Sequence, residues 1–231
     1  MKISIIGTGQ IGGTLARRFS ALGHQVFIAN SRGPASLGDL AREAGARPLS
    51  VIEAAHNGDV VIITIPEKNI TQLPADLFAG VPDNVIVVDT GNYYPRQRDG
   101  RIDGIEAGAA ESRWVAQQLR RPVVKAFNNI YARHLMDLGK PAGAPGRIAL
   151  PVAGDVASSK TVVIRLLDEL GFDAVDAGGL DESWRQQPGS LVYTTDFDMA
   201  GVKRALSEAT KERKPEWRAT ANSPGSFAQP A

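Results

Sequence analysis

The residues with the clearest chemical potential are three glycines close to the N-terminus, spaced as Gly-x-Gly-x-x-Gly. An apolar run, residues 3–6, precedes them and an amphipathic segment follows, so they are expected in a turn between a strand and a helix. The chain has 24 glycines, so chance matches to the spacing are common, and it is this context that favours a function. In such a turn the first glycine permits the bend, the second lets the backbone approach phosphates, and the third lets the helix pack on the strand. Free N–H groups at the helix N-terminus bind the anion. The sequence therefore predicts a dinucleotide site that includes Gly7, Thr8, Gly9, Gln10, Ile11 and Gly12.

The end of the next expected strand, residues 26–29, indicates which dinucleotide binds. Proteins that bind NAD usually carry an acidic residue here, which bonds the ribose 2′-hydroxyl. This chain has Asn30, Ser31 and Arg32 instead, with no carboxylate to repel a 2′-phosphate. A hydroxyl and a guanidinium suit a phosphate well. The alternative is an ordinary solvated arginine in a loop. The pattern favours NADP(H) as the cofactor.

Three further strand ends are candidates for the cofactor site, because ligands of parallel sheets bind beyond the carboxyl ends of strands. The apolar run 59–66 ends in Thr64, Ile65 and Pro66, although Pro66 is equally suited to ending the strand. Asn92 follows the run 84–88, in a stretch whose composition is also typical of a turn. Ala126 closes the run 122–127. We expect all five residues beside the cofactor.

Catalytic groups are sparse. Asn128 follows the fifth expected strand and could orient a carboxamide or an acceptor, and His134 is the one histidine near a strand's carboxyl end, a candidate proton donor. A helix-borne surface histidine is the alternative for His134. The other histidines, His24 and His56, are expected in surface positions, and none of the three has the spacing of a metal site. No metal is expected.

Composition narrows the class of protein. A formal charge of +1 over 231 residues gives no basic footprint for nucleic acid. The chain has no cysteine, which excludes disulfides and thiolate chemistry. No apolar run approaches the length of a membrane span, and a strand beginning at residue 2 leaves no room for a signal peptide. We expect a cytoplasmic protein with a small-molecule partner.

Apolar runs alternating with helical patterns predict an α/β fold of the Rossmann type, doubly wound around a mainly parallel sheet, with a small C-terminal lobe. The expected parts are a dinucleotide-binding domain over residues 1–180, a helical lobe over 181–213 and a flexible tail over 214–231. The expected strands are 3–6, 26–29, 59–66, 84–88, 122–127, 148–153 and 172–176. The expected helices are 35–44, 51–56, 112–119, 157–170 and 199–209, with a surface loop at 96–104.

Four segments resemble the NADPH-dependent coenzyme F420 reductases, the F420H2:NADP oxidoreductases and their bacterial relatives. They are Gly7–Gly13, Asn30–Pro34, Val124–Asn128 and Asp176–Gly178. The resemblance covers residues 1 to about 180. It implies pyrophosphate binding by Thr8–Ile11, 2′-phosphate binding by Ser31 and Arg32, a deazaflavin stacked on the nicotinamide, and a homodimer. Two departures from the archaeal members, Asn128 in place of a histidine and the segment 183–188, lie on the acceptor side.

The resemblance implies hydride transfer between NADP(H) and coenzyme F420 or a similar flat redox acceptor. Such a transfer needs alignment and exclusion of water more than acid–base groups, which fits the scarcity of catalytic residues. Two alternatives stay open from the residues alone. One is an NADPH-dependent flavin, quinone or ferric reductase, and the other is an NADP(H)-binding sensor without turnover.

Overall fold

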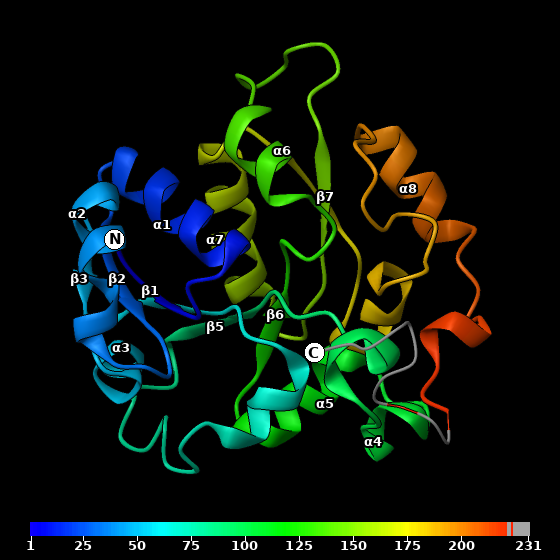
Figure 1. Ribbon diagram of the computed structural model, residues 1–231. Helices are drawn as coiled ribbons and strands as arrows, with labels where there is room; N and C mark the ends of the chain where they lie inside the picture. The colour runs from blue at the N-terminus through cyan, green and yellow to red at the C-terminus, as the bar shows by residue number, and fades with distance from the viewer. Residues whose placement is uncertain (221–222, 224–231) are drawn as a thin grey trace.

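The computed structural model describes residues 1–220 and 223, and its centre is a parallel sheet with helices on both faces (Figure 1). Its strands and α-helices are β1 (Lys2–Ile6), α1 (Gln10–Ala21), β2 (Gln25–Ala29), α2 (Gly38–Ala44), β3 (Arg47–Pro48), α3 (Val51–Asn57), β4 (Val60–Ile63), β5 (Ile86–Asp89), α4 (Asp103–Glu106), α5 (Glu111–Leu119), β6 (Val123–Lys125), α6 (Ala132–Asp137), β7 (Ala149–Val152), α7 (Ala157–Glu169), β8 (Asp173–Asp176) and α8 (Met199–Ser207). Shorter helical turns occupy Pro34–Leu37, Glu67–Gln72, Pro95–Asp99, Leu180–Gln186 and Pro215–Trp217.

The main sheet has the strand order β3-β2-β1-β4-β5-β6, and every neighbouring pair is parallel. Ile5 of β1 lies in register with Ile28 of β2 on one side and with Ile62 of β4 on the other. The chain winds away from β1 in both directions, so the connections leave a crevice at the carboxyl ends of β1 and β4. This arrangement confirms the predicted Rossmann-type fold.

Both faces of the sheet are buried, which explains the continuous apolar runs in the sequence. Successive side chains of a strand point to opposite faces. Ile62 packs into the apolar cluster that includes α1 and α7, while its neighbour Ile63 packs into the cluster that includes α3 and α5. Figure 1 shows these helices on the two sides of the sheet.

The last two expected strands do not extend the main sheet. β7 and β8 pair only with each other, in parallel, and form a second, two-stranded sheet. The two sheets are joined at one antiparallel bridge, in which Lys125 N–H donates to Ala153 O over 2.8 Å and Ala153 N–H donates back over 3.1 Å. The chain reaches β7 through α6 and the loop that follows it, and therefore runs antiparallel to β6 where the two meet.

The surface loop expected at residues 96–104 is partly wrong. Residues Pro95–Asp99 form a helical turn, and the side chain of Asp99 is buried. The Asp99 carboxylate accepts hydrogen bonds from the backbone N–H of Tyr94 at 2.8 Å and of Lys68 at 3.3 Å, and it pairs with Arg98. These contacts tie the segment to the sheet. A polar composition alone did not reveal them.

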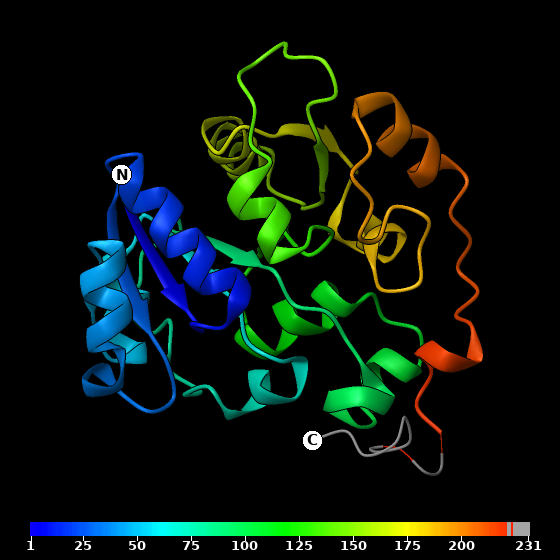
Figure 2. The ribbon, with the colours of Figure 1, turned by 45° about the horizontal axis from the view of Figure 1, so that its top comes forward.

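The C-terminal segment packs on the second sheet and then on α4. α8 shares an apolar cluster with β7 and β8, so its contacts cross the boundary expected at residue 180. After α8 the chain returns beside α4 (Figure 2), where Arg213 pairs with Glu106 and Ala219 N–H donates to Glu106 Oε1 at 2.9 Å. Of the tail expected over 214–231, residues 221–222 and 224–231 lie outside the described residues. Within the part of the chain that is described, no helix has the length and apolar character needed to cross a membrane.

Candidate functional site

The glycine turn between β1 and α1 is fixed by close packing against the end of β4. Gly7 has a φ of +106°, and a Cβ at this position would lie 2.2 Å from the carbonyl oxygen of Thr64. A Cβ at Gly12 would lie 2.0 Å from the carbonyl oxygen of Gly7. By contrast, a Cβ at Gly9 would meet no atom within 4 Å. The outer two glycines are therefore required by packing, and the middle one leaves open space in front of the helix.

The N-terminus of α1 faces this space with its backbone donors available. Gly9 occupies the N-cap position without a side-chain cap, and the first turn, which holds Gln10, Ile11 and Gly12, contains no acidic residue. Helix N-termini of this kind attract anions through unpaired N–H groups and the helix dipole. The local structure thus matches the phosphate-binding turn predicted from the glycines.

A cavity of about 510 Å³ opens beside the turn and gathers most of the predicted cofactor residues. It contains no acidic side chain among its lining residues. The residues that line it are Ile6, Gly7, Thr8, Gly9, Asn30, Ser31, Arg32, Val51, Thr64, Ile65, Pro66, Asn69, Gln72, Leu73 and Pro74. Nine of these were candidates from the sequence. Val51 and the group from Asn69 to Pro74 were not, because they reach the cavity from the helical turns before and after β4.

The loop after β2 is held in shape by Asn30. Its Oδ1 accepts a hydrogen bond from the backbone N–H of Arg32 at 2.9 Å, and its side chain also bonds the hydroxyl of Ser36. Ser31 and Arg32 are exposed at the cavity wall, and no carboxylate of residues 1–220 or 223 forms an ion pair with Arg32. The loop therefore presents one uncompensated guanidinium to the cavity.

A buried charged cluster, absent from the sequence-based candidates, lies at the carboxyl ends of β4, β5 and β6. Asp89 and Lys125 are cross-strand partners in register, and the Lys125 ammonium donates to Asp89 Oδ2 at 3.1 Å and to the carbonyl of Gly91 at 2.5 Å. The second Asp89 oxygen accepts from the backbone N–H of Gly91 at 2.8 Å, and Ser112 Oγ donates to Asp89 at 2.6 Å. The side chain of Glu67 completes the cluster. All of these side chains are buried.

The titration of the cluster follows from its burial. Burial, reinforced by Asp89, raises the pKa of Glu67 well above its usual value, against the lowering effect of Lys125. Burial alone would lower the pKa of Lys125, but the neighbouring carboxyls outweigh it and the net shift is upward. Glu111, which accepts from the backbone N–H of Tyr93 at 3.2 Å, has its pKa raised to about 7 by burial. The raised pKa of Lys125 keeps its ammonium group cationic at neutral pH, and the raised pKa of Glu67 favours the protonated form of that carboxyl group.

Amide side chains connect the loops after β5 and β6. Asn92 and Asn128 are bonded twice, by Asn92 Nδ2 to Asn128 O at 3.1 Å and by Asn128 Nδ2 to Asn92 Oδ1 at 3.0 Å. Asn128 Nδ2 and Asn129 Nδ2 also donate to the carbonyl of Gln186, at 2.7 and 2.9 Å. Asn92 is half-buried, whereas Asn128 is buried inside this network. Asn128 thus serves the architecture of the strand ends, and only Asn92 retains exposed surface.

Five of the predicted cofactor residues, Gln10, Ile11, Gly12, Asn92 and Ala126, and the candidate His134 are not among the residues that line the cavity. The side chain of Ala126 is fully buried in the apolar core, and its place beside the cofactor stays a prediction. His134 on α6 pairs through Nδ1 with Asp196 at 2.8 Å. His24 is not a free surface residue, since its Nε2 contacts Glu169 at 2.8 Å and its ring packs edge-on against Phe19. Neither histidine lines the cavity.

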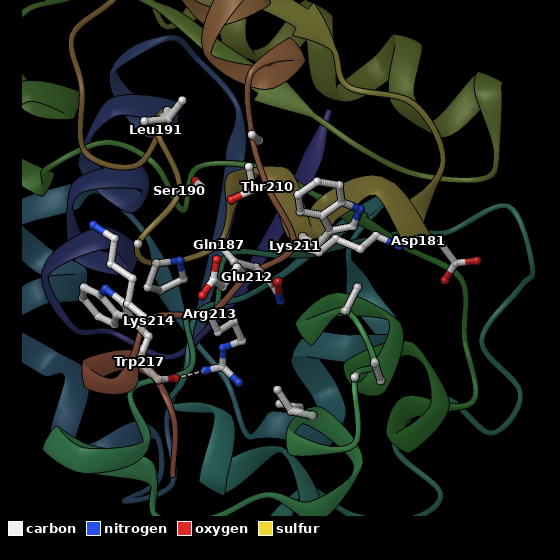
Figure 3. Close-up of a pocket in the computed structure, with 18 of the residues that line it drawn as sticks. Asp181, Gln187, Ser190, Leu191, Thr210, Lys211, Glu212, Arg213, Lys214 and Trp217 are labelled. Carbon is white, nitrogen blue, oxygen red and sulfur yellow. Dashed lines mark hydrogen bonds between the residues drawn. The ribbon is translucent and has the colours of Figure 1, made fainter.

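A second cavity, of about 410 Å³, lies between α4, α5 and the C-terminal segment (Figure 3). Its walls combine aromatic, basic and acidic side chains, among them Trp184, Lys211, Glu212 and Trp217. It adjoins the loop after β5, because Trp217 packs near Tyr94 with ring centroids 6.1 Å apart. No sequence pattern indicates this cavity, because its walls come from segments about a hundred residues apart.

A comparison with known protein families matches the N-terminal part of the chain. The family model described as "NADP oxidoreductase coenzyme F420-dependent" matches residues 2–93, which contain the whole lining of the first cavity. The YjhV protein of Escherichia coli K12 is 38% identical over 92 residues, which are 40% of this chain and 60% of that protein. The match therefore spans less than two thirds of that relative.

Solved structures extend the likeness beyond the N-terminal part. The hypothetical protein SMa0349 of Sinorhizobium meliloti aligns with a TM-score of 0.72 and 32% identity, over 85% of this chain and 95% of that chain. The Arthrobacter protein named "putative F420 dependent NADP-reductase" aligns with a TM-score of 0.61 and 25% identity, over 78% and 86%. A 3-hydroxyisobutyrate dehydrogenase of Mycobacterium tuberculosis, at 16% identity, shares the fold. With its phosphate-binding turn, its Rossmann-type sheet and these relatives, the chain belongs to the coenzyme F420-dependent NADP oxidoreductase family.

Proposed function

We propose that this protein is an NADP(H)-dependent oxidoreductase that transfers hydride between NADP(H) and coenzyme F420 or a similar flat redox acceptor. One observation carries the cofactor assignment. The cavity at the glycine turn contains a phosphate-binding helix terminus and the unpaired Arg32, with no carboxylate in its lining. A 2′-phosphate supplies the negative charge that this loop lacks.

The topology of the sheet orients the dinucleotide. The pyrophosphate would sit at Gly7–Gly9 and the N-terminus of α1, and the 2′-phosphate at Ser31 and Arg32, after β2. Because β2 lies on one side of β1 and β4 on the other, the nicotinamide half would extend over the ends of β4 and β5. Thr64, Ile65 and Asn92 follow or border these strand ends.

The mechanism asks little of the side chains. NADPH would supply the hydride when bound, and the protein's residues would hold it beside its acceptor and exclude water. The apolar wall of Ile65, Pro66 and Leu73 serves to exclude water from the cavity. In this proposal Asn92 orients the cofactor by hydrogen bonds, and no side chain is assigned a proton transfer.

The acceptor is the finer part of the proposal. Coenzyme F420 is supported by the family model and by the name of the Arthrobacter relative, which covers most of both chains. The second cavity supports a flat acceptor, because it adjoins the loop after β5 and two of the chain's three tryptophans line it. Aromatic walls suit the faces of a planar ring system.

The decisive experiment measures oxidation of NADPH, at 340 nm, in the presence of F420, FMN, FAD, a soluble quinone or ferric citrate, each in a separate reaction. Oxidation with F420 alone is the expected result. Oxidation only with another acceptor would show that F420 is not the acceptor, while the assignment as an NADPH-dependent reductase would stand. Binding of NADPH with no oxidation by any acceptor would reject the reductase and favour an NADP(H)-binding sensor. A parallel titration with NADH tests the preference for the phosphorylated cofactor.

We also propose that the protein works as a homodimer in the cytoplasm. The resemblance to F420 reductases supports the homodimer. Light scattering after gel filtration would give about twice the chain mass of 24.6 kDa for a dimer. A peak at the mass of one chain would reject the dimer.

A further inference from the structure

The buried side chains of Glu67, Asp89 and Lys125 form a unit, called the strand-end clamp below. The clamp hydrogen-bonds both backbone polar groups of Gly91. Asp89 accepts from the Gly91 N–H at 2.8 Å, and Lys125 donates to the Gly91 carbonyl at 2.5 Å. The carboxyl group of Glu67 packs against the Cα of Gly91. A Cβ at Gly91 would lie 2.5 Å from Glu67 Oε1 and 3.0 Å from Asp89 Oδ1.

We infer that the strand-end clamp positions Asn92 to recognise the carboxamide of the nicotinamide ring. Glu67, Asp89 and Lys125 are positioning residues in this view, and they act through Gly91 without touching the cofactor. The inference rests on the proposed function, since it requires that a nicotinamide occupy the crevice at the ends of β4 and β5.

Asn92 has the hydrogen-bonding capacity for this role. Its two head-group atoms each make one bond to Asn128, at 3.1 and 3.0 Å, and its backbone carbonyl accepts from Arg98 at 2.5 Å. An amide group has two N–H donors and two acceptor positions. One donor and one acceptor therefore remain, which is the complement of a carboxamide. Asn92 is half-buried, so part of its surface is exposed.

Stability alone is a poor explanation for the clamp. A buried ion pair is often no better for stability than apolar residues of similar size, because both charges lose their water. Here the buried set also includes Glu67, whose two carboxyl oxygens have no hydrogen-bond partner among the described residues. Such groups are retained where an exact placement of the chain matters. The placed segment leads directly from Gly91 to Asn92.

The clamp and the first cavity are connected through Glu67. Pro66 lines the cavity, and Glu67 is the next residue, at the start of the turn Glu67–Gln72. Asn69 and Gln72 of the same turn also line the cavity. One short segment, residues 66–72, therefore contributes both to the cavity wall that would face the cofactor and, through Glu67, to the clamp that positions Asn92.

The test compares the binding of three ligands by calorimetry: 2′,5′-ADP, NADP⁺, and the 3-acetylpyridine analogue of NADP⁺, which lacks the carboxamide NH₂. The wild-type protein should bind NADP⁺ more tightly than the acetylpyridine analogue. Gly91→Ala and Asn92→Ala should each remove most of that preference, about tenfold or less in affinity. Both variants should bind 2′,5′-ADP as the wild type does, since the adenine end is formed by other loops.

Two further variants keep the test independent of folding. Gly38→Ala is the matched control, because a Cβ there meets no atom within 4 Å and its φ of −55° suits alanine. In Gly91→Ala combined with Glu67→Ala, the shortened side chain removes the nearest clash, and the preference for NADP⁺ should partly return. A double variant that behaves like Gly91→Ala would contradict the role of Glu67.

The possible failures are distinguishable. If the wild type binds no 2′,5′-ADP, the proposed cofactor is wrong. If it binds 2′,5′-ADP but does not discriminate NADP⁺ from its acetylpyridine analogue, the inference about Asn92 is overturned and the cofactor assignment stands. An equal loss of affinity for all three ligands in Gly91→Ala would reduce the clamp to a structural role and also overturn the inference.

Discussion

Arg32 determines the proposed choice of cofactor, because it is the one cationic side chain in the lining of the first cavity. We expect Arg32→Ala to weaken NADPH binding by roughly 1.5–3 kcal/mol, the range for hydrogen bonds to charged groups, which is tens-fold or more in Kd. The affinity for NADH should change much less. Arg42→Ala is a suitable control, since Arg42 is an exposed arginine paired with Asp39 outside the cavity. Equal losses for NADPH and NADH would remove Arg32 from the 2′-phosphate site.

Glu111 gives the protein a pH dependence of stability. Its pKa is raised from 4.5 to about 7 in the folded protein, chiefly by burial. Between these values the folded state keeps a proton that the unfolded state releases, so this contribution is fully present below pH 4.5 and is lost as the pH rises to about 7. The free energy of unfolding, measured in urea at pH 5 and pH 8, should fall with pH. Glu67, shifted in the same direction, adds to the decline.

The variant Glu111→Gln isolates this effect. A glutamine stays neutral and can still accept the hydrogen bond from Tyr93 N–H. We expect a smaller fall in stability between pH 5 and pH 8, with a gain at pH 8 on the order of 1–3 kcal/mol. A variant as pH-dependent as the wild type would show that Glu111 titrates normally.

At the scale of single residues, the sequence predicted the cofactor loop well and missed the strand-end clamp. The loop residues follow a local pattern, strand then glycine turn then helix, that is legible within thirty residues. Asp89 and Lys125 are 36 residues apart and meet only because β5 and β6 pair in this register. A lysine inside the apolar run 122–127 was the available signal, since a buried lysine requires a partner.

At the scale of elements, α3 begins with a capping box. Ser50 Oγ accepts from the backbone N–H of Glu53 at 3.2 Å, and Glu53 Oε2 accepts from the backbone N–H of Ser50 at 2.9 Å. Ser50→Ala should lower the free energy of unfolding by about 1 kcal/mol, while Ser50→Thr should retain most of it. Calorimetric or urea unfolding measures both. Identical losses in the two variants would show that the hydroxyl is not the cap.

The elements that the sequence placed incorrectly are those whose position depends on tertiary contacts. The strands β7 and β8 were recognised as strands, but nothing local distinguishes a strand of the main sheet from one of a second sheet. The turn Pro95–Asp99 reads as a polar loop, and it is ordered by the buried carboxylate of Asp99. The short helix α6 has no side-chain cap at its N-terminus, so the sequence contains no capping residue from which its start could be predicted.

At the scale of the whole molecule, the second cavity, which we propose holds the acceptor, shares no lining residue with the first cavity. Its residue Trp217 lies near Tyr94 and Tyr193, and Tyr94 follows β5. We expect Trp217→Ala to raise the KM for the acceptor about tenfold. An aromatic contact with the acceptor contributes about 1–1.5 kcal/mol of binding free energy, and the variant loses that contact. The Kd for NADPH should stay the same. Trp217→Phe, which keeps a ring, is the control.

If Trp217→Ala raised the Kd for NADPH as much as the KM for the acceptor, the proposal that the two ligands bind in different cavities would be contradicted. Unchanged KM values for every acceptor would place the acceptor elsewhere. The sequence pattern could not have suggested the experiment, because the cavity is enclosed by α4, α5 and a segment that returns from beyond α8. Such an enclosure is a property of the complete chain.

The lining of the first cavity has one further consequence, which concerns biosynthesis. Every residue that lines it lies between Ile6 and Pro74, whereas the strands of the second sheet begin at Ala149. During translation the N-terminal part of a chain emerges first. All residues that line the first cavity are therefore synthesised before the first residue of β5, and long before Ala153 can bridge to Lys125. The residues that line the second cavity begin at Ile105 and are synthesised later.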